Sequence, residues 1–240
     1  MFKNKAETYE LFKKFYGRDC LSVTSERDFD AFRKFRAKNR TFFVKPALGS
    51  GGKGIYLEDA ADETDEQVFN RVLNVAPAIV ESLIRQHPVF RELHPDSVNT
   101  VRIPTVRYLD GTVKVFHPFL RIGVGPSVVD NAASGGIFAP IDPETGIITQ
   151  KGITESGVYY LKHPESGVVL PGFQIPEWSA AVALVKELAD VIPECRYVGW
   201  DCALTEKGWI MVEGNLYGQF VDQFATKRGI KRELDALLEN

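Results

Sequence analysis

Apolar residues in the first 40 positions recur at the spacing of a helix. One apolar stripe ends at Gly17, and a second lies further along; together they comprise Leu11, Phe12, Phe15, Tyr16, Phe29, Phe32 and Phe35. Residues three or four positions apart lie on one face of a helix. Residues 1–40 are therefore predicted to form a short helical N-terminal segment with two helices.

From Thr41 the pattern changes to short runs of β-branched and aromatic residues. Strands are predicted at 41–45, 55–57, 78–84, 100–109, 112–122, 198–205 and 209–215, and helices at 68–73, 176–192 and 222–238. Residues 123–172 are rich in Gly, Pro, Ser and Asp, and this stretch is predicted to hold short strands and a substrate-facing loop. The mixture of elements predicts an α+β protein.

Composition narrows the class of protein. The chain has 240 residues, of which 44% are hydrophobic and 25% charged, and this excludes disordered, collagen-like and solenoid proteins. Three cysteines without C-x-x-C spacing disfavour a disulfide framework or a structural zinc site and favour a reducing compartment, so we expect a cytoplasmic protein. No apolar run has the length of a transmembrane segment, and the N-terminus does not lead into the apolar core of a signal peptide.

The charge is unevenly distributed along the chain. The net charge of −3 gives no general attraction to nucleic acid or anionic lipid. Residues 1–40, however, hold 11 Lys or Arg residues and only six Asp or Glu residues. This basic segment is either a solvated helical face or a docking surface for a partner protein or a membrane, and the sequence leaves both interpretations open.

A glycine-rich stretch between two predicted strands is the first candidate for chemistry. Gly49, Gly51 and Gly54 match G-x-G-x-x-G, but the dinucleotide fingerprint requires a helix directly afterwards, and a strand is predicted there. The P-loop pattern fails as well, because it requires Ser or Thr where Gly54 stands. The remaining interpretation is a β-hairpin flap whose N–H groups bind phosphates, with Lys45 and Lys53 adding positive charge. The alternative is a hairpin loop without a ligand.

Acidic residues on the last two predicted strands are the second candidate. A three-residue loop at 206–208 would place Asp201 opposite Glu213, with Asn215 on the same face. These side chains carry the hard oxygen donors that magnesium prefers. Apolar residues alternate on the opposite face, which predicts that the acids line a cleft. Carboxylates that are merely solvated are the alternative.

Two arginines form the third candidate. A two-residue loop at Asp110-Gly111 would place Arg102 opposite Phe119 and on the same face as Arg121. Two guanidinium groups on one face repel each other unless an anion lies between them, and arginine suits carboxylate or phosphate. The alternative is that each arginine pairs with a local acid.

These motifs, taken in order, resemble the ATP-grasp superfamily, and more narrowly its sugar-transfer-associated branch. The resemblance to the superfamily rests on Val44-Lys45-Pro46, Gly49–Gly54, Ile79–Ile84, Asp201 and Glu213-Gly214-Asn215. The resemblance to the branch rests on Asn99–Arg102, Leu120–Gly123, Val129–Asn131, Gly135-Gly136 and Gly199–Asp201. It implies an ATP-grasp fold in which two subdomains clasp the nucleotide. Residues 1–40 would then be the helical N-terminal segment, 41–84 the first subdomain with flap and hinge, and 85–240 the second subdomain with the metal and substrate site.

The resemblance also implies ATP and magnesium as cofactors and a role for each candidate residue. The nucleotide-binding set is Lys45, Gly49, Ser50, Gly51, Gly52, Lys53, Gly54, Val80, Glu81, Ser82 and Leu83. The metal set is Asp201, Glu213 and Asn215; the catalytic set is Arg102, Arg121 and Lys45; and the acceptor-binding set is Asp130, Asn131, Gly135 and Gly136. The first of the two lysines that usually bind the nucleotide is not identified, with Lys34 and Lys38 among the candidates.

The activity implied by the resemblance is ATP-dependent ligation of a small-molecule carboxylate to an amine or another nucleophile through an acyl phosphate, in polysaccharide or cell-envelope biosynthesis. Two alternatives remain open at this point. One is a small-molecule kinase of the same fold, and the other is a non-catalytic nucleotide-binding adaptor. The presence of all three metal-type residues argues against the adaptor, because binding alone requires fewer of them.

Overall fold

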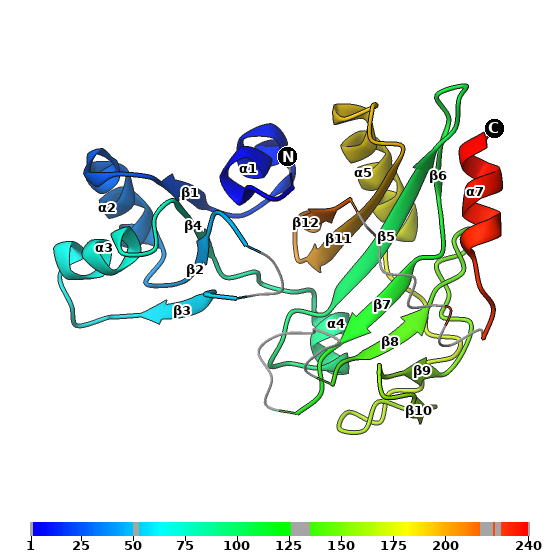
Figure 1. The fold of residues 1–240 in the computed structure, drawn as a ribbon. Helices are drawn as coiled ribbons and strands as arrows, with labels where there is room; N and C mark the ends of the chain where they lie inside the picture. The colour runs from blue at the N-terminus through cyan, green and yellow to red at the C-terminus, as the bar shows by residue number, and fades with distance from the viewer. Residues whose placement is uncertain (1, 50–52, 126–134, 217–222, 224–226, 240) are drawn as a thin grey trace. The chain divides into compact units, whose positions relative to one another are not determined.

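The computed structural model describes residues 2–49, 53–125, 135–216, 223 and 227–239 (Figure 1). The chain divides into two compact units, Met1–Ile84 and Arg85–Asn240. The mixed α+β architecture with antiparallel sheets confirms the predicted fold class. No helix in the described ranges is long and apolar enough to cross a membrane.

The first unit is a four-stranded antiparallel sheet with helices. Its elements are α1 (Lys5–Phe12), β1 (Cys20–Val23), α2 (Phe29–Lys38), β2 (Thr41–Pro46), β3 (Tyr56–Asp59), α3 (Asp65–Leu73) and β4 (Ala78–Ser82). The strand order is β1-β4-β2-β3. Both N-terminal helices were predicted, whereas β1 was not, because its four residues follow a turn with no alternating pattern.

The two faces of this sheet differ in what covers them. Side chains alternate along a strand, so Phe42 and Val44 of β2 lie on the same face as Val80 of β4. They pack with residues of α2 and α3 into one core cluster that also contains Val23, Phe32, Phe35, Ala60, Val68, Phe69, Val72 and Ala78. Lys45 and Glu81 therefore lie on the opposite face.

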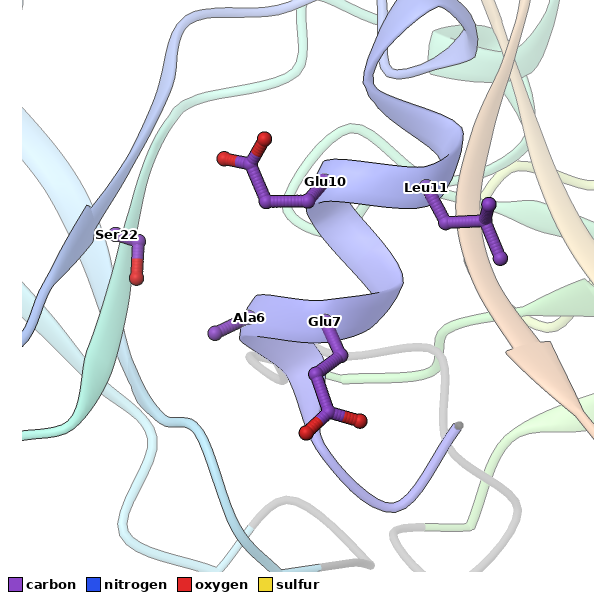
Figure 2. A pocket seen from close by; sticks show the side chains of 5 residues that line it. All are labelled: Ala6, Glu7, Glu10, Leu11 and Ser22. Carbon is purple, nitrogen blue, oxygen red and sulfur yellow. The ribbon is translucent and has the colours of Figure 1, made fainter.

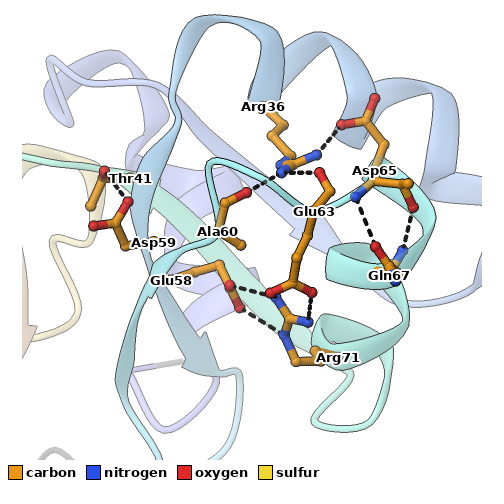
Figure 3. A network of polar contacts seen from close by, with 10 residues as sticks. Arg36, Thr41, Glu58, Asp59, Ala60, Glu63, Asp65, Gln67 and Arg71 are labelled. Carbon is orange, nitrogen blue, oxygen red and sulfur yellow. Dashed lines mark hydrogen bonds and ion pairs between the residues drawn. The ribbon is translucent and has the colours of Figure 1, made fainter.

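Two arginines form hydrogen bonds and ion pairs with the connection between β3 and α3 (Figure 3). The buried Arg36 donates through Nη2 to the carbonyl oxygens of Ala60 and Glu63, at 2.5 and 2.8 Å, and pairs with Asp65. Arg71 of α3 pairs with Glu58 at 2.7 Å and with Glu63. Carbonyl groups that no strand or helix satisfies thus gain charged donors.

The second unit is built on a larger antiparallel sheet. The described elements are α4 (Pro88–Leu93), β5 (Thr100–Arg107), β6 (Val113–Val115), β7 (Phe119–Ile122), β8 (Ile137–Pro140), β9 (Gly152–Ile153), β10 (Tyr159–Tyr160), α5 (Trp178–Val191), β11 (Tyr197–Thr205), β12 (Gly208–Asn215) and α7 (Lys231–Glu239). The strand order is β10-β9-β8-β7-β5-β11-β12, and β6 also pairs with β5. The last strands in sequence, β11 and β12, thus join the sheet beside β5.

Helices pack on both faces of this sheet (Figure 1). On one face, Val106 of β5 packs with Phe116 and with Ile230 and Leu234 at α7. Arg102 lies on the same face as Val106, because the two positions differ by four along the strand. On the other face, Arg107 pairs with Asp190 of α5 at 2.6 Å.

The C-terminal helix was predicted to be continuous from 222 to 238, and this prediction was wrong. Residues 227–230 are not helical, and Lys227 has a φ of 55°. A positive φ is outside the helical region. Helix α7 begins only at Lys231, so the amphipathic pattern extended the predicted helix across a break.

Candidate active site

The glycine-rich stretch connects two paired strands. Strands β2 and β3 pair antiparallel, with Val44 opposite Tyr56, so the stretch is a hairpin connection and no helix follows it. Gly49 and Gly54 have φ values of 122° and 75°, which L-amino acids with a side chain rarely adopt. Lys53 is exposed. Ser50, Gly51 and Gly52 lie outside the described residues.

A lysine that sequence reasoning missed lies at the start of this stretch. Lys5 Nζ donates to Gly49 O at 3.0 Å and to Pro46 O at 3.3 Å, and the Lys5 N–H donates to Ala47 O at 2.8 Å. Lys34 and Lys38 are on α2, which packs against the sheet face opposite Lys45. Lys5 is thus a lysine of the N-terminal segment that contacts the start of the glycine-rich stretch, although no local pattern distinguishes it in the sequence.

Lys45 and Glu81 form an ion pair on their face of the sheet. Lys45 Nζ donates to Glu81 Oε2 at 2.7 Å, and Arg18 donates to the same oxygen through Nη2 at 2.7 Å and through Nε at 3.1 Å. Burial by itself would raise the pKa of Glu81, but the charges of Arg18 and Lys45 outweigh it and lower the pKa to about 2. Glu81, expected to be the acid of the hinge, is therefore an ionised partner of two cations.

The remaining hinge residues differ in exposure. Val80 is fully buried in the core cluster, and Ser82 pairs with Phe42 at the end of β4. The Ser82 N–H donates to Asp19 O at 2.9 Å. Beyond the strand, the side chain of Leu83 is 43% exposed. Of the predicted hinge residues, Leu83 is therefore the most exposed.

A pocket of about 750 Å³ opens elsewhere in the first unit, between α1 and β1 (Figure 2). It is lined by Ala6, Glu7, Glu10, Leu11 and Ser22. Two carboxylates in its lining disfavour phosphate, and neither Lys45 nor Glu81 belongs to that lining. This pocket is separate from the ion pair described above.

The strand register in the second unit places the two predicted arginines on one face. Arg102 is opposite Phe119, and Arg121 is opposite Thr100. The turn differs from the prediction, because Tyr108 pairs with Thr112 and the loop has three residues instead of two. One extra residue between positions 116 and 119 compensates for the longer loop, so Arg102 is again opposite Phe119, as predicted.

Strands β11 and β12 also have the predicted pairing, although the loop between them differs in length from the prediction. Thr205 is opposite Gly208, so the loop has two residues where three were predicted. A bulge at Asp201/Cys202, with Val212 as the extra residue, restores the pairing of Asp201 with Glu213. Asn215, two positions further, lies on the same face.

Arg102, Arg121 and Asp201 form one buried cluster. Arg102 donates to both carboxylate oxygens of Asp201, through Nε to Oδ1 and through Nη2 to Oδ2, the latter at 2.9 Å. Arg121 Nη2 lies 3.3 Å from Oδ2, and its Nε donates to Thr100 Oγ1 at 2.9 Å. The anion between the two guanidinium groups is therefore Asp201 itself.

Burial and charge act in opposite directions on Asp201, which is only 2% exposed. Burial would raise its pKa, whereas the charges of Arg102 and Arg121 lower it, and the net effect is a pKa below the usual value. Glu213 by contrast is exposed and Asn215 half-buried. Of the two acids predicted to line a cleft, Glu213 is therefore accessible, whereas Asp201 is buried beneath its contacts with the two arginines.

The donor set on this face suits a hard cation in its chemistry. Asp201, Glu213 and Asn215 offer carboxylate and amide oxygens, and each carboxylate oxygen has two lone pairs. Arg102 donates to both Asp201 oxygens, Arg121 Nη2 lies 3.3 Å from Oδ2, and the Asn215 side chain also acts on this carboxylate and lowers its pKa, so donors already surround Asp201. Among the described residues, no group of three or more His, Cys, Asp or Glu side chains is placed to hold a metal ion. A cation here would thus depend on Glu213, on the Asn215 oxygen and on ligands from outside the chain.

The predicted acceptor-binding residues are described only in part. Asp130 and Asn131 lie outside the described residues. Gly135 has a φ of 86° and is exposed, and Gly136 directly precedes β8. Because Phe138 of β8 pairs with Arg121, these glycines lie near the end of the strand that carries the arginine.

Two buried histidines hold the segment that follows Arg121. His94 Nε2 lies 2.9 Å from Gly125 O, and His163 Nε2 lies 2.9 Å from Gly123 O. The Gly125 N–H donates to Glu165 Oε1 at 2.6 Å. These partners were not predicted, because they come from segments distant in sequence.

The cysteines are unsuited to nucleophilic catalysis. Burial raises the pKa of Cys20 to about 12, and burial also raises the pKa values of Cys195 and Cys202. Thiols with such pKa values stay protonated at neutral pH, whereas the thiolate is the nucleophile.

Comparison with known proteins gives a match over nearly the whole chain. A family model described as sugar-transfer-associated ATP-grasp matches residues 3–237. No curated protein matches the chain.

Several solved structures share the fold at low sequence identity. N5-carboxyaminoimidazole synthetase from Staphylococcus aureus, complexed with ADP, has a TM-score of 0.59 at 13% identity, over 94% of this chain and 48% of that one. D-alanyl-alanine synthetase A from Vibrio cholerae has a TM-score of 0.55 at 13% identity, over 98% and 62%. The ATP-grasp ligase PsnB, complexed with minimal precursor, Mg and ADP, has a TM-score of 0.55 at 13% identity, over 98% and 57%. The chain thus spans less than two thirds of each.

Proposed function

The chain belongs to the sugar-transfer-associated ATP-grasp family, and we propose that it is an ATP-dependent ligase that joins a carboxylate to an amine or another nucleophile through an acyl phosphate. The observation that carries this proposal is the cluster of Arg102 and Arg121 on Asp201, beside Glu213 and Asn215. It provides two guanidinium groups and hard oxygen donors on one sheet face.

ATP binding is assigned to the first unit's lysine and glycine residues. Lys45 would contact the nucleotide phosphates, the glycines from Gly49 to Gly54 would close over them, and Lys5 would supply the second cation at the start of that stretch. The exposed end of the hinge at Leu83 would meet the adenine. Support comes from the ammonium groups of Lys5 and Lys45, which both lie close to the strand that leads into the glycines.

Magnesium would be held by the oxygens of Asp201, Glu213 and Asn215. When bound, the cation would neutralise charge on the nucleotide phosphates. Arg102 and Arg121 would bind the transferred phosphoryl group and the substrate carboxylate in addition to Asp201, since each guanidinium group has five N–H donors. Charge stabilisation by preorganised donors is the main contribution such a site makes, and it requires no nucleophilic side chain.

The acceptor is proposed only as a class of compound, an amine or another nucleophile. Gly135 and Gly136, together with Asp130 and Asn131, are proposed to bind the acceptor. The family's association with sugar transfer supports a role in polysaccharide or cell-envelope biosynthesis.

The test is a screen for ADP release with pairs of acids and amines, with mass spectrometry of the products and hydroxylamine as a trap. A ligase yields a hydroxamate from the correct acid. Lys45→Ala should lower turnover on the order of 10²-fold, as expected for the loss of one charge-stabilising donor, whereas Lys38→Ala, exposed on α2, should not. A phosphorylated hydroxyl product without hydroxamate would indicate a kinase. MgATP binding without any turnover would indicate an adaptor.

A further inference from the structure

Arg18 is a buried cation whose role the proposed function does not yet include. It follows α1 and precedes β1, and its side chain is 3% exposed. It donates to Glu81 Oε2 through Nη2 at 2.7 Å and through Nε at 3.1 Å, and Lys45 donates to the same oxygen. Three charged groups thus meet at one oxygen atom.

Other contacts fix Arg18 in this position. Its Nη1 donates to Tyr16 O at 3.1 Å, and its guanidinium lies 4.6 Å from the centre of the Tyr16 ring. A guanidinium held by a carbonyl, a carboxylate and an aromatic ring is preorganised. Lys45 differs, since its side chain remains 18% exposed. Of the two cations on Glu81, Lys45 is thus the one that is partly exposed to solvent.

The net charge of Arg18, Lys45 and Glu81 determines how strongly Lys45 attracts phosphate. If Lys45 alone were paired with Glu81, the pair would be neutral and would attract phosphate weakly. With Arg18 the three groups carry a net charge of +1. Because Glu81 stays ionised, with its pKa lowered to about 2, this balance holds at neutral pH.

We propose that Arg18 is a positioning residue that compensates Glu81, so that Lys45 is held in place by the carboxylate and still acts on nucleotide phosphate as a net positive charge. This inference rests on the proposed function of Lys45. In this inference the N-terminal segment takes part in phosphate recognition through Arg18. Glu81 orients Lys45 and does not itself contact the nucleotide.

The test measures the affinities of ATP and adenosine separately by calorimetry. Arg18→Met removes the compensating charge and should weaken ATP binding by about 10-fold, the effect of one charge several ångströms from phosphate at an intermediate dielectric constant. Adenosine has no phosphate, so its affinity should not change. Arg33→Met removes the same charge from an exposed position on α2, whose nearest acid is 3.7 Å away, and should leave both affinities unchanged.

A double variant distinguishes charge compensation from a structural role. In Arg18→Met combined with Glu81→Gln, Lys45 again provides a net charge of +1, so ATP affinity should return to within about threefold of the wild-type value. Arg18→Lys should retain most of it as well. If the double variant binds ATP as weakly as Arg18→Met, or if adenosine binding falls in parallel, Arg18 has only a structural role and the inference is wrong.

The same measurements separate this inference from the proposed function. If ATP binds to the wild-type protein and Lys45→Ala weakens it while Arg18→Met does not, only the inference fails. If the wild-type protein does not bind ATP, or if Lys45→Ala has no effect, both fail.

Discussion

Removal of one partner from the buried ion pair between Arg102 and Asp201 should strongly destabilise the second unit. Replacement of Arg102 by Met retains an apolar side chain of similar length but removes both donors to the carboxylate. The two residues are 5% and 2% exposed, so water cannot replace the lost hydrogen bonds. Asp201 would retain Arg121, whose Nη2 lies 3.3 Å away.

The expected loss follows from this burial. Removal of one partner from a buried ion pair costs about 3–5 kcal/mol, because the other charge is left without compensation. Arg121 remains near the carboxylate, so we expect about 3 kcal/mol for Arg102→Met, the lower end of that range. In the double variant Arg102→Met with Asp201→Asn no buried carboxylate remains, and the loss should be clearly less than the sum of the single losses.

Urea unfolding followed by tryptophan fluorescence measures this effect in the correct unit. All three tryptophans, Trp178, Trp200 and Trp209, belong to the second unit, and Trp200 is next to Asp201 in β11. A loss below about 1 kcal/mol for Arg102→Met, or a double variant that loses the full sum, would refute the assignment of a coupled buried pair.

The pH dependence gives an independent check. The pKa of Asp201 is lowered in the folded state, because the charges of Arg102 and Arg121 outweigh burial. The unfolded state therefore binds more protons near its pKa of about 3.9, so stability rises with pH there. The contribution of Asp201 should be complete above about pH 5 and lost as the pH falls through the folded pKa. Asp201→Asn should lack this component.

Three further predictions concern other contacts. Gly123→Ala should destabilise the second unit by about 1–3 kcal/mol, because its Cβ would clash with Ser97 Oγ. Gly229→Ala, whose nearest neighbour among the described residues is Gln223 Oε1 at 3.7 Å, should cost little in the same urea titration. Glu81, with a pKa lowered from 4.5 to about 2, should stabilise the first unit above pH 4.5 and lose that effect toward pH 2, and Glu81→Gln should flatten this part of an acid titration followed by circular dichroism. Arg36→Met removes the guanidinium donor from Ala60 O, Glu63 O and Asp65, so amide exchange measured by mass spectrometry should accelerate around α2 and α3 and stay unchanged in the second unit.

Local patterns predicted most of the elements because burial imposes a period on each of them. The aromatic stripes predicted α1 and α2, and the change from β-type runs to glycine and back predicted the hairpin of β2 and β3. Short elements, such as the four residues of β1 and the six of α4, gave too little periodicity to be found. The break before α7 was missed because its pattern continues through residues that are not helical.

The register around the candidate site shows where local reasoning is incomplete. Asp201 faces Glu213 and Arg102 faces Phe119 as predicted, yet both hairpin loops differ in length from the prediction by one residue. In each case an extra residue further along the strand compensates for the difference. A shift of one residue would move every following side chain to the other face, so packing of the sheet fixes the register independently of the turn.

The sequence by itself therefore determined the types of residue and the faces on which they lie, because alternation along a strand is a local property. Only the tertiary structure decided which of them meet. Arg102 and Asp201 are 99 positions apart, and Arg18 and Glu81 are 63 positions apart. These pairs form because β11 lies beside β5 and β4 lies beside β1. The order of strands in a sheet depends on how the whole chain buries its apolar surface, and no local pattern contains it.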